Sequence, residues 1–547
     1  MKRVLLMLVV VGLAMAAPSL GNPFVFDDLP KIVENRDLDT LGVGRLIYPY
    51  SSASSRARND PSRPLVFYTY ALNKALSSAP WIFHLTDAVL HVLAAFLLFL
   101  VARRITPEVA PFLALVFLTH PLMFGVALYP YARAEILAAI FMLGGIVAWM
   151  QERRAITLAC YVLALMSKQS AIVLPLLLLF IERRKVGPLF VVALIYLGLR
   201  AWLLGGLGDL EADPETLWSA RRYMDAQPYV VLRYAQLILF PLGLSADHVV
   251  PELGIALRLL GWAFLVLCAL AFWFRPRLRF GLAFFFLLLA PTSSLLPTAD
   301  AMVERRAYLA SAGLLFILAP LFADLDSRSR RTARVLGFVV IAAFVALSLR
   351  RGAIGDSEQH LWADVLETYP TNERGLLRLA QLSSDDEAAF ALYDRLFALH
   401  PRHFAGYNSL GALYYRREQP ALAERFFRFA LEIRPSYAPA RINLERITQA
   451  SSAVVAPPVR ALREEVGPPL TSAYKASLIE NRALVVSLYR AQIEKHPETT
   501  KFRRKLIEML LFIDRPDDAL VELEALAAIE PDDLEVRRKI ESLRAPR

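Results

Sequence analysis

Long apolar runs fill the chain up to about residue 350. Each is roughly 17–25 residues long, which is the length that a helix needs to cross a bilayer. Charged residues are sparse up to about Arg350 and dense beyond it. The pattern predicts an all-α protein in which a polytopic membrane domain, residues 1–355, precedes a soluble domain, residues 356–547.

Clusters of Lys and Arg between the apolar runs set the predicted topology. Because such clusters stay on the cytoplasmic side, they predict about eleven crossings, with residues 21–80 and 205–228 as outer loops. Segment 229–244 carries Arg233 and is predicted to be re-entrant or interfacial. The first run has features of a cleaved signal peptide, but we expect an uncleaved span. The predicted spans are 4–20, 81–101, 109–128, three segments that end near 153, 167 and 183, then 189–204, 256–274, 280–297, 307–323 and 335–349.

The soluble part of the chain contains a repeat. His400-Pro401 and Arg434-Pro435 lie 34 residues apart, and the same interval separates His496-Pro497 from Glu530-Pro531. Small residues stand where two helices would cross, and a proline follows the second helix, which is the tetratricopeptide pattern. Such helix pairs bury their apolar faces by stacking on neighbours. The sequence therefore predicts a C-terminal α-solenoid, interrupted near residues 451–475.

The net charge of +10 does not indicate a nucleic-acid-binding protein. Many of the basic residues stand in short clusters between apolar runs, where membrane topology explains them. The soluble part mixes both signs, as solvated helix faces do. Cys160 and Cys268 both lie inside apolar runs, so they form neither a disulfide framework nor a zinc motif. We expect membrane lipids, and no nucleic acid, among the partners.

Asp27 and Asp28 follow an aromatic and apolar stretch at a predicted membrane edge. One interpretation is a solvated acidic turn. The other is a general base, a metal site or both, because a carboxylate in a partly desolvated cavity can accept a proton from an alcohol. The predicted topology places both acids and the repeat domain on the same, non-cytoplasmic side.

A series of short motifs in a fixed order carries a family resemblance. The motifs are Phe24-Val25-Phe26-Asp27-Asp28, Asn35, Ser62-Arg63-Pro64-Leu65, His84-Leu85, Leu90-His91, His120-Pro121, Arg133-Ala134-Glu135, Ser167-Lys168 and Glu304-Arg305-Arg306-Ala307-Tyr308-Leu309. With the repeat tail, they resemble the transmembrane-and-tetratricopeptide O-mannosyltransferases, which are similar to glycosyltransferases of the GT-C fold. The match extends over essentially the whole chain.

The resemblance implies an inverting transfer of mannose or another hexose. The donor would be a polyprenyl-phosphate sugar, the acceptors Ser and Thr hydroxyls of exported proteins, and the base Asp27 or Asp28. The tetratricopeptide domain would hold the acceptor protein. Lys168-Gln169 stands where the family has Lys-Glu, and the outer loop at 205–228 is short. These differences indicate a bacterial relative, located in the inner membrane with its catalytic face in the periplasm, whereas a eukaryotic protein would face the ER lumen.

Several cations could stabilise a phosphate leaving group. Arg305 and Arg306 are favoured, because they lie at the predicted outer end of a span, where the positive-inside rule disfavours cations. Arg133 and Lys168 are further candidates, with lipid head groups as their alternative partners. Glu135 is interpreted as a salt-bridge partner of Arg133 in preference to a second acid on the sugar. The remaining substrate-binding candidates are Arg63, His91, His120, His248 and Glu304.

His84, Asp87 and His91 recur at helical spacing on one face. They could ligate a divalent metal, although a polar stripe between spans shows the same spacing. Two other functions compete with the glycosyltransferase: a transporter, and a non-enzymatic assembly platform built on the repeats. Transporters place ionisable residues near the bilayer midplane, often in repeated halves. Here the charges gather at the outer ends, which favours chemistry at the surface.

Overall fold

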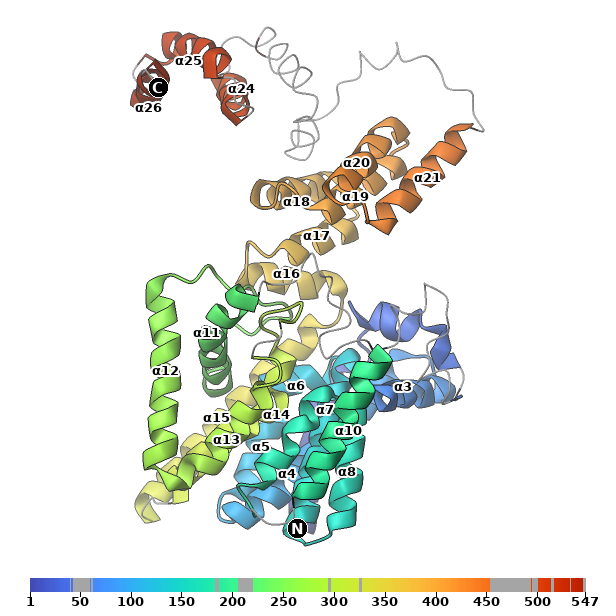
Figure 1. Cartoon of the computed structure of the whole chain (residues 1–547), viewed down its shortest axis with the longest axis vertical. Helices are drawn as coiled ribbons and strands as arrows, with labels where there is room; N and C mark the ends of the chain where they lie inside the picture. Colours follow the sequence, from blue (N-terminus) through green and yellow to red (C-terminus); the bar gives the residue numbers. More distant parts are fainter. Residues whose placement is uncertain are drawn as a thin grey trace. The chain divides into compact units, whose positions relative to one another are not determined.

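The structure is a computed structural model that describes two compact units, Met1–Asn372 and Glu373–Arg547. Its described residues are 1–39, 41–42, 60, 62–182, 186–204, 220–293, 297–323, 327–452, 493, 500–512, 516–531 and 533–544. All regular secondary structure within these ranges is helical, which confirms the predicted all-α class (Figure 1). The first unit extends beyond residue 355 and includes α16 (Glu358–Thr368).

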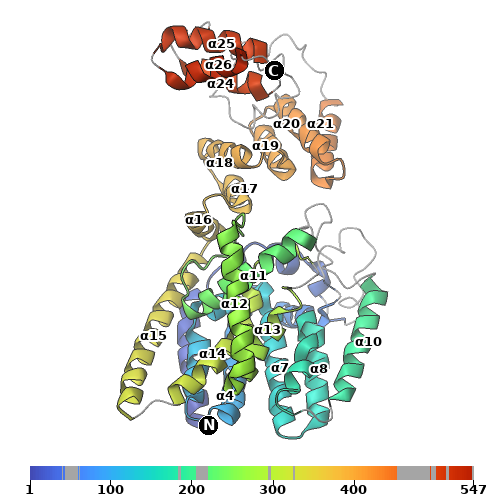
Figure 2. The same ribbon diagram turned by 60° about the vertical axis from the view of Figure 1, so that its left-hand side comes forward.

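The membrane unit is built around α4 (Pro80–Ile105) and α7 (Arg133–Met150), which pack against each other. Helix α8 (Arg154–Ser167) packs on α7. Figure 2 shows that the axes of these helices are roughly aligned with the axis of α10 (Gly187–Leu204). Helix α1 (Lys2–Ala16) packs on α4. Their contact needs a glycine, because a Cβ on Gly12 would lie 2.4 Å from Val92 Cγ2.

Five helices are long and apolar enough to cross a membrane, as judged over the described residues. A sixth span results if the pair α5 (Ala110–Thr119) and α6 (Pro121–Ala127), bent by 60°, is counted as one. The protein is therefore an integral membrane protein. The remaining predicted spans correspond to shorter apolar helices, so the structure does not confirm the count of eleven crossings.

One prediction about the middle of the chain changes. The expected outer loop at 205–228 is wrong over its second part, because residues 220–228 belong to α11 (Ala220–Leu239); residues 205–219 lie outside the described ranges. Helix α11 buries one face, whereas α12 (Ile255–Phe274) buries only Gly261 (Figure 1). A helix that is apolar all round and exposed within the chain is suited to contact lipid.

Helices α13 (Arg279–Leu289) and α14 (Ala307–Ala323) cross very closely. A Cβ on Gly281 would lie 2.7 Å from the carbonyl oxygen of Gly313, and a Cβ on Gly313 would lie 2.6 Å from that of Gly281. Small residues at such a crossing let two membrane helices approach backbone to backbone. The crossing fixes α14, and with it the short helix η7 (Glu304–Arg306) that leads into it.

The second unit consists of packed helix pairs. Helix α17 (Glu373–Leu382) packs on α18 (Asp386–Leu399), and α19 (Phe404–Arg416) packs on α20 (Pro420–Ile433), which also contacts α21 (Ala438–Ser452). Further along the chain, α25 (Pro516–Ile529) contacts both α24 (Thr500–Phe512) and α26 (Leu534–Arg544). These pairs are consistent with the predicted repeats. The predicted interruption at 451–475 falls almost entirely outside the described residues, as does His496-Pro497.

Candidate active site

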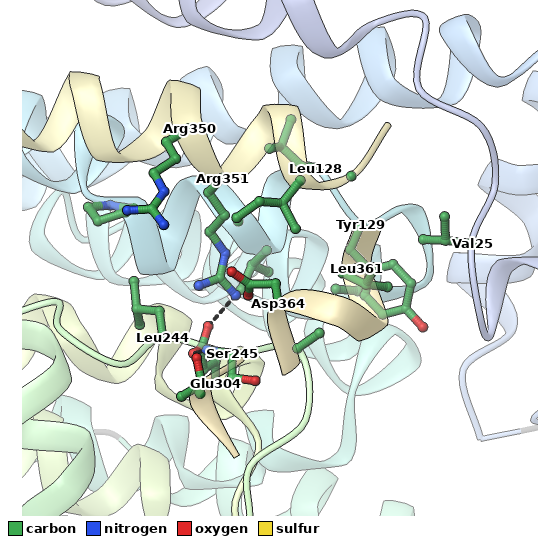
Figure 3. A pocket seen from close by; sticks show the side chains of 18 of the residues that line it. Val25, Leu128, Tyr129, Leu244, Ser245, Glu304, Arg350, Arg351, Leu361 and Asp364 are labelled. Atoms are coloured by element: carbon green, nitrogen blue, oxygen red, sulfur yellow. Dashed lines mark hydrogen bonds and ion pairs between the residues drawn. The ribbon is translucent and has the colours of Figure 1, made fainter. Parts of the chain in front are cut away.

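A cavity of about 460 Å³ lies where several helices of the membrane unit end (Figure 3). Its walls come from the first loop, the turn before η4 (Pro130–Ala132), the segment after α11, η7, the end of α15 (Ser327–Ile354) and α16. The residues of the wall include Val25, Phe26, His84, Tyr129, Glu304, Arg305, Arg350, Arg351, Trp362 and Asp364.

Asp28 is fully buried and anchors the first loop. One carboxylate oxygen accepts the Tyr131 N–H at 2.8 Å, and the other accepts the Val25 N–H at 3.3 Å. Burial raises the pKa of Asp28 well above its usual range, against the two backbone hydrogen bonds that lower it. Because both oxygens are engaged by backbone donors, Asp28 joins the first loop to the η4 turn.

Asp27 is half-buried and lies beside two wall residues of the cavity. Its backbone N–H donates to the Tyr129 hydroxyl at 3.2 Å. Burial raises the pKa of Tyr129 well above its usual range, and the negative charge of Asp27 raises it further. Burial disfavours the charge of Arg305, but Tyr131, Tyr129 and Asp27 together raise its pKa. The Asp27 carboxylate and the Arg305 guanidinium are thus electrostatic neighbours at the edge of the cavity.

Glu304 joins three segments of the chain at the floor of the cavity. Its Oε1 accepts the Ser245 N–H at 2.7 Å and the His248 Nε2–H at 2.8 Å, while its Oε2 accepts from Arg351 at 2.5 Å (Figure 3). Burial alone would raise the pKa of Glu304, but Arg351, His248 and Ser245 outweigh it and lower the pKa. His248 also contacts the Tyr369 hydroxyl at 2.8 Å.

We expect Glu304 to make the membrane unit sensitive to acid. A carboxyl whose pKa is lowered by folding stabilises the folded state at neutral pH, and this contribution is lost as the pH falls through the lowered pKa. Glu304→Gln should lower the free energy of unfolding by about 3 kcal/mol at pH 7. In this variant the free energy of unfolding should also decrease less than in wild type as the pH falls below about 5. Thermal unfolding in detergent at both pH values measures this. The exposed Glu252→Gln serves as control, and an identical acid response of E304Q and wild type would contradict the prediction.

Arg133 is held in a buried ion pair. Its Nε lies 2.6 Å from Asp87 Oδ1, both side chains are fully buried, and Nη1 also donates to Asn73 Oδ1 at 2.7 Å. Arg133 does not line the cavity. The expected pairing of Arg133 with Glu135 is wrong, since Glu135 pairs with Lys168. The ion pair instead connects α3 (Pro64–Leu76), α4 and α7.

Four cations, which we call the basic cluster, gather near the Lys168 end of α8: Arg63, Lys168, Arg305 and Arg306. Burial lowers the pKa of Lys168 well below its usual range, and the charges of the three arginines lower it further. Arg63 pairs with Asp60 at 3.0 Å, and Arg306 donates to the Thr298 hydroxyl at 2.9 Å. Glu135 and Asp60 neutralise part of this charge, and Arg305 and Arg306 remain the cations best placed to attract an anion.

The histidines on α4 and at the α5–α6 bend have separate partners. His84 Nε2 lies 3.1 Å from the Asn22 carbonyl oxygen, and His91 lies between the Tyr308 hydroxyl at 2.7 Å and the Leu118 carbonyl oxygen. His120 contacts the Ile238 carbonyl oxygen at 2.9 Å. With Asp87 committed to Arg133, the predicted set of His84, Asp87 and His91 does not converge on one point. Within the described ranges, no three His, Cys, Asp or Glu side chains are placed to hold a metal.

The sequence has named relatives among known proteins. It is 24% identical over 426 residues to protein O-mannosyl-transferase F38B6.6 of Caenorhabditis elegans, covering 70% of this chain and 60% of that protein. It is also 29% and 28% identical over 141 residues to the mouse and human proteins named O-mannosyl-transferase TMTC3, covering 25% of this chain and 15% of each. The chain is thus similar to proteins named protein O-mannosyl-transferases. No family model matches it.

These relatives confirm the resemblance found in the sequence. The chain spans less than two thirds of each relative's own length, so the activities in their names apply to those proteins.

Among the predicted substrate-binding residues, Glu304 and Arg305 line the cavity. His120 does not line it, although the next residue, Pro121, does.

Four residues on the cavity wall were not predicted from the sequence: Arg350, Arg351, Trp362 and Asp364. The two arginines could have been predicted, because they directly follow the predicted span 335–349 at its outer end. In the same way, Arg305 and Arg306 directly precede the predicted span 307–323 at its outer end. Nothing in the local sequence marked Trp362 or Asp364, because α16 resembles the amphipathic helices that follow it.

Proposed function

We propose that this protein is a membrane glycosyltransferase that moves a hexose from a polyprenyl-phosphate donor to Ser or Thr hydroxyls of proteins. The observation that carries the proposal is the position of an acid, Asp27, which is bonded to Tyr129 and lies in the electrostatic field of Arg305. Both Tyr129 and Arg305 line a cavity, and the chain is similar to proteins named O-mannosyl-transferases. Those names favour mannose as the sugar.

Asp27 is the proposed base. It takes the proton of the acceptor hydroxyl as the hydroxyl oxygen attacks the anomeric carbon of the sugar. The bond from that carbon to the phosphate oxygen breaks, the polyprenyl phosphate leaves with the electron pair, and the configuration at the carbon inverts. Asp27 suits this role better than Asp28, because both oxygens of Asp28 already accept backbone hydrogen bonds.

The basic cluster is the proposed site of the donor phosphate. Negative charge develops on the leaving phosphate in the transition state, and preorganised cations stabilise it most where water is excluded. Arg305 belongs both to this cluster and to the surroundings of Asp27, so a donor phosphate held there would bring its anomeric carbon close to the proposed base. We place this face on the non-cytoplasmic side, where a lipid-linked sugar replaces nucleotide sugars; a bacterial inner membrane is the favoured location.

The helix pairs of the second unit are proposed to bind acceptor proteins. Stacked pairs of this kind form extended surfaces that hold peptide segments. The proposed role concerns recruitment and not chemistry, so it predicts that loss of the second unit affects protein acceptors more than short peptides.

A transfer assay tests the proposed function. Purified protein in lipid vesicles would receive radiolabelled polyprenyl-phosphate mannose and a Ser/Thr-rich peptide, with the same peptide carrying Ala at those positions as control. We expect label on the hydroxyl-bearing peptide only. Parallel reactions with polyprenyl-phosphate glucose and with GDP-mannose identify the sugar and the carrier. Absence of transfer from every lipid-linked donor to a panel of acceptors would overturn the proposal.

A further inference from the structure

Phe26, which directly precedes Asp27, has an uncommon backbone conformation. Its φ of 49° lies in the left-handed region, which few residues other than glycine adopt without cost. Such a conformation persists only where the surroundings over-determine it, and it is enriched at functional sites. Contacts around Phe26 must therefore hold it in this conformation.

Trp362 of α16 packs on Phe26. The two rings meet edge to face, with centroids 5.2 Å apart and planes at 85°, and both residues line the cavity. Trp362 is only 1% exposed, and its indole N–H donates to Glu358 Oε1 at 3.2 Å, one helical turn earlier. The ring that supports Phe26 is therefore itself fixed in orientation.

Helix α16 is firmly placed within the membrane unit. Ser357 caps its first turn by accepting the His360 N–H at 3.1 Å. Beyond its end, the Tyr369 hydroxyl contacts His248, and Asn372 Nδ2 donates to Asp247 at 3.0 Å. The contacts of Tyr369 and Asn372 tie the C-terminal end of α16 to the segment that also supplies Glu304 with His248.

The first loop has other attachments, and the Phe26 carbonyl oxygen itself accepts the Leu29 N–H at 3.2 Å. Asp28 accepts the N–H groups of Val25 and Tyr131, and Asp27 donates its own N–H to Tyr129. These bonds fix the backbone around the two acids but do not contact the Phe26 ring. The edge-to-face contact with Trp362 supports the Phe26 ring at the cavity wall.

We propose that Trp362 is a positioning residue for catalysis: by packing on Phe26, it holds the strained turn that sets the position of Asp27 beside the cavity wall. This inference rests on the proposed function, in which Asp27 is the base. Without the indole, Phe26 would relax toward an ordinary φ and rotate the next residue. Because proton transfer requires hydrogen-bond distance, a displacement of about 1 Å costs up to 100-fold in rate.

Steady-state kinetics of full-length variants test the inference. Trp362→Leu and Phe26→Ala should each lower kcat by about 10- to 100-fold and leave KM for the peptide within about twofold, because ground-state binding does not use the base. Trp362→Phe, which keeps an aromatic ring, should restore most of kcat. The double variant W362L/F26A should be no slower than the worse single variant, since both remove the same contact.

Val365→Ala is the matched control. Val365 is fully buried on α16 but does not line the cavity, so its truncation loosens the helix without removing the contact with Phe26. We expect near wild-type kcat for V365A. An equal loss of kcat in V365A and W362L, or strictly additive losses in W362L/F26A, would overturn the inference.

Hydrogen exchange measured by mass spectrometry gives a readout that does not depend on activity. In W362L and F26A, the segment 22–36 should exchange about tenfold faster than in wild type, whereas in V365A its exchange should be unchanged. If wild type shows no transferase activity but the exchange pattern appears, the proposed function fails while the structural part of the inference stands. Unchanged exchange in W362L would refute the inference even if the enzyme is active.

Discussion

Asp27→Asn is expected to lower kcat by about 10²–10⁴-fold while the free energy of unfolding stays near that of wild type. The amide cannot accept the hydroxyl proton, yet it has the same shape, and the hydrogen bond from residue 27 to the Tyr129 hydroxyl uses the backbone N–H and not the side chain. Peptide glycosylation in vesicles measures the rate, and thermal unfolding in detergent measures the stability. Retained activity in D27N would remove Asp27 from the mechanism.

Asp28→Asn is the matched comparison, and it should lower the stability of the protein more than it lowers kcat. An amide offers only one acceptor oxygen, so its NH₂ group would face either the Val25 N–H or the Tyr131 N–H. Leaving one buried donor without an acceptor costs about 1–3 kcal/mol, so D28N should unfold at lower temperature. A stable D28N that is inactive, beside an active D27N, would assign the base to Asp28 instead.

Breaking the Arg133–Asp87 pair is expected to give the largest loss of stability in the membrane unit. Arg133→Met or Asp87→Leu alone should lower the free energy of unfolding by about 3–5 kcal/mol, because each leaves a buried charge uncompensated. The double variant R133M/D87L should recover a large part of that loss. Chemical or thermal unfolding in detergent provides the measurement.

The pair Arg258–Asp225 provides the control for this prediction. Its side chains are 49% and 37% exposed, so Arg258→Met should change the free energy of unfolding by less than about 1 kcal/mol. A stable R133M that has lost activity would instead support the phosphate-binding role that the sequence suggested for Arg133. The structure favours the structural role, because the guanidinium is fully committed to Asp87 and Asn73.

The helical character of the chain was predictable because apolar runs of membrane length leave few alternatives to a helix. The lengths of individual helices were less predictable. The run at 109–128 was predicted as one span, but the backbone bends by 60° where His120 precedes Pro121. Proline restricts the residue before it and lacks an N–H, so a single residue divides an otherwise uniform apolar run.

The candidate site was predictable only where its chemistry is local in sequence. The acidic pair and the cations of η7 stand out in the sequence as charged residues at membrane edges. The different environments of Asp27 and Asp28 could not be predicted, because they depend on Tyr131, which lies about a hundred residues further along. The pairing of Lys168 with Glu135 depends on how α7 and α8 pack, which no pattern along a single helix specifies.

The inclusion of α16 in the first unit bears on how proteins of this architecture can diversify. Because α16 supplies a wall of the cavity, the joint at which repeats can be exchanged, duplicated or lost lies after Asn372 and not at the end of the last membrane helix. Helix α16 looks like part of the repeat array in sequence but belongs to the membrane unit. Chimeras that join the membrane module of one relative to the repeats of another should therefore be spliced beyond this helix.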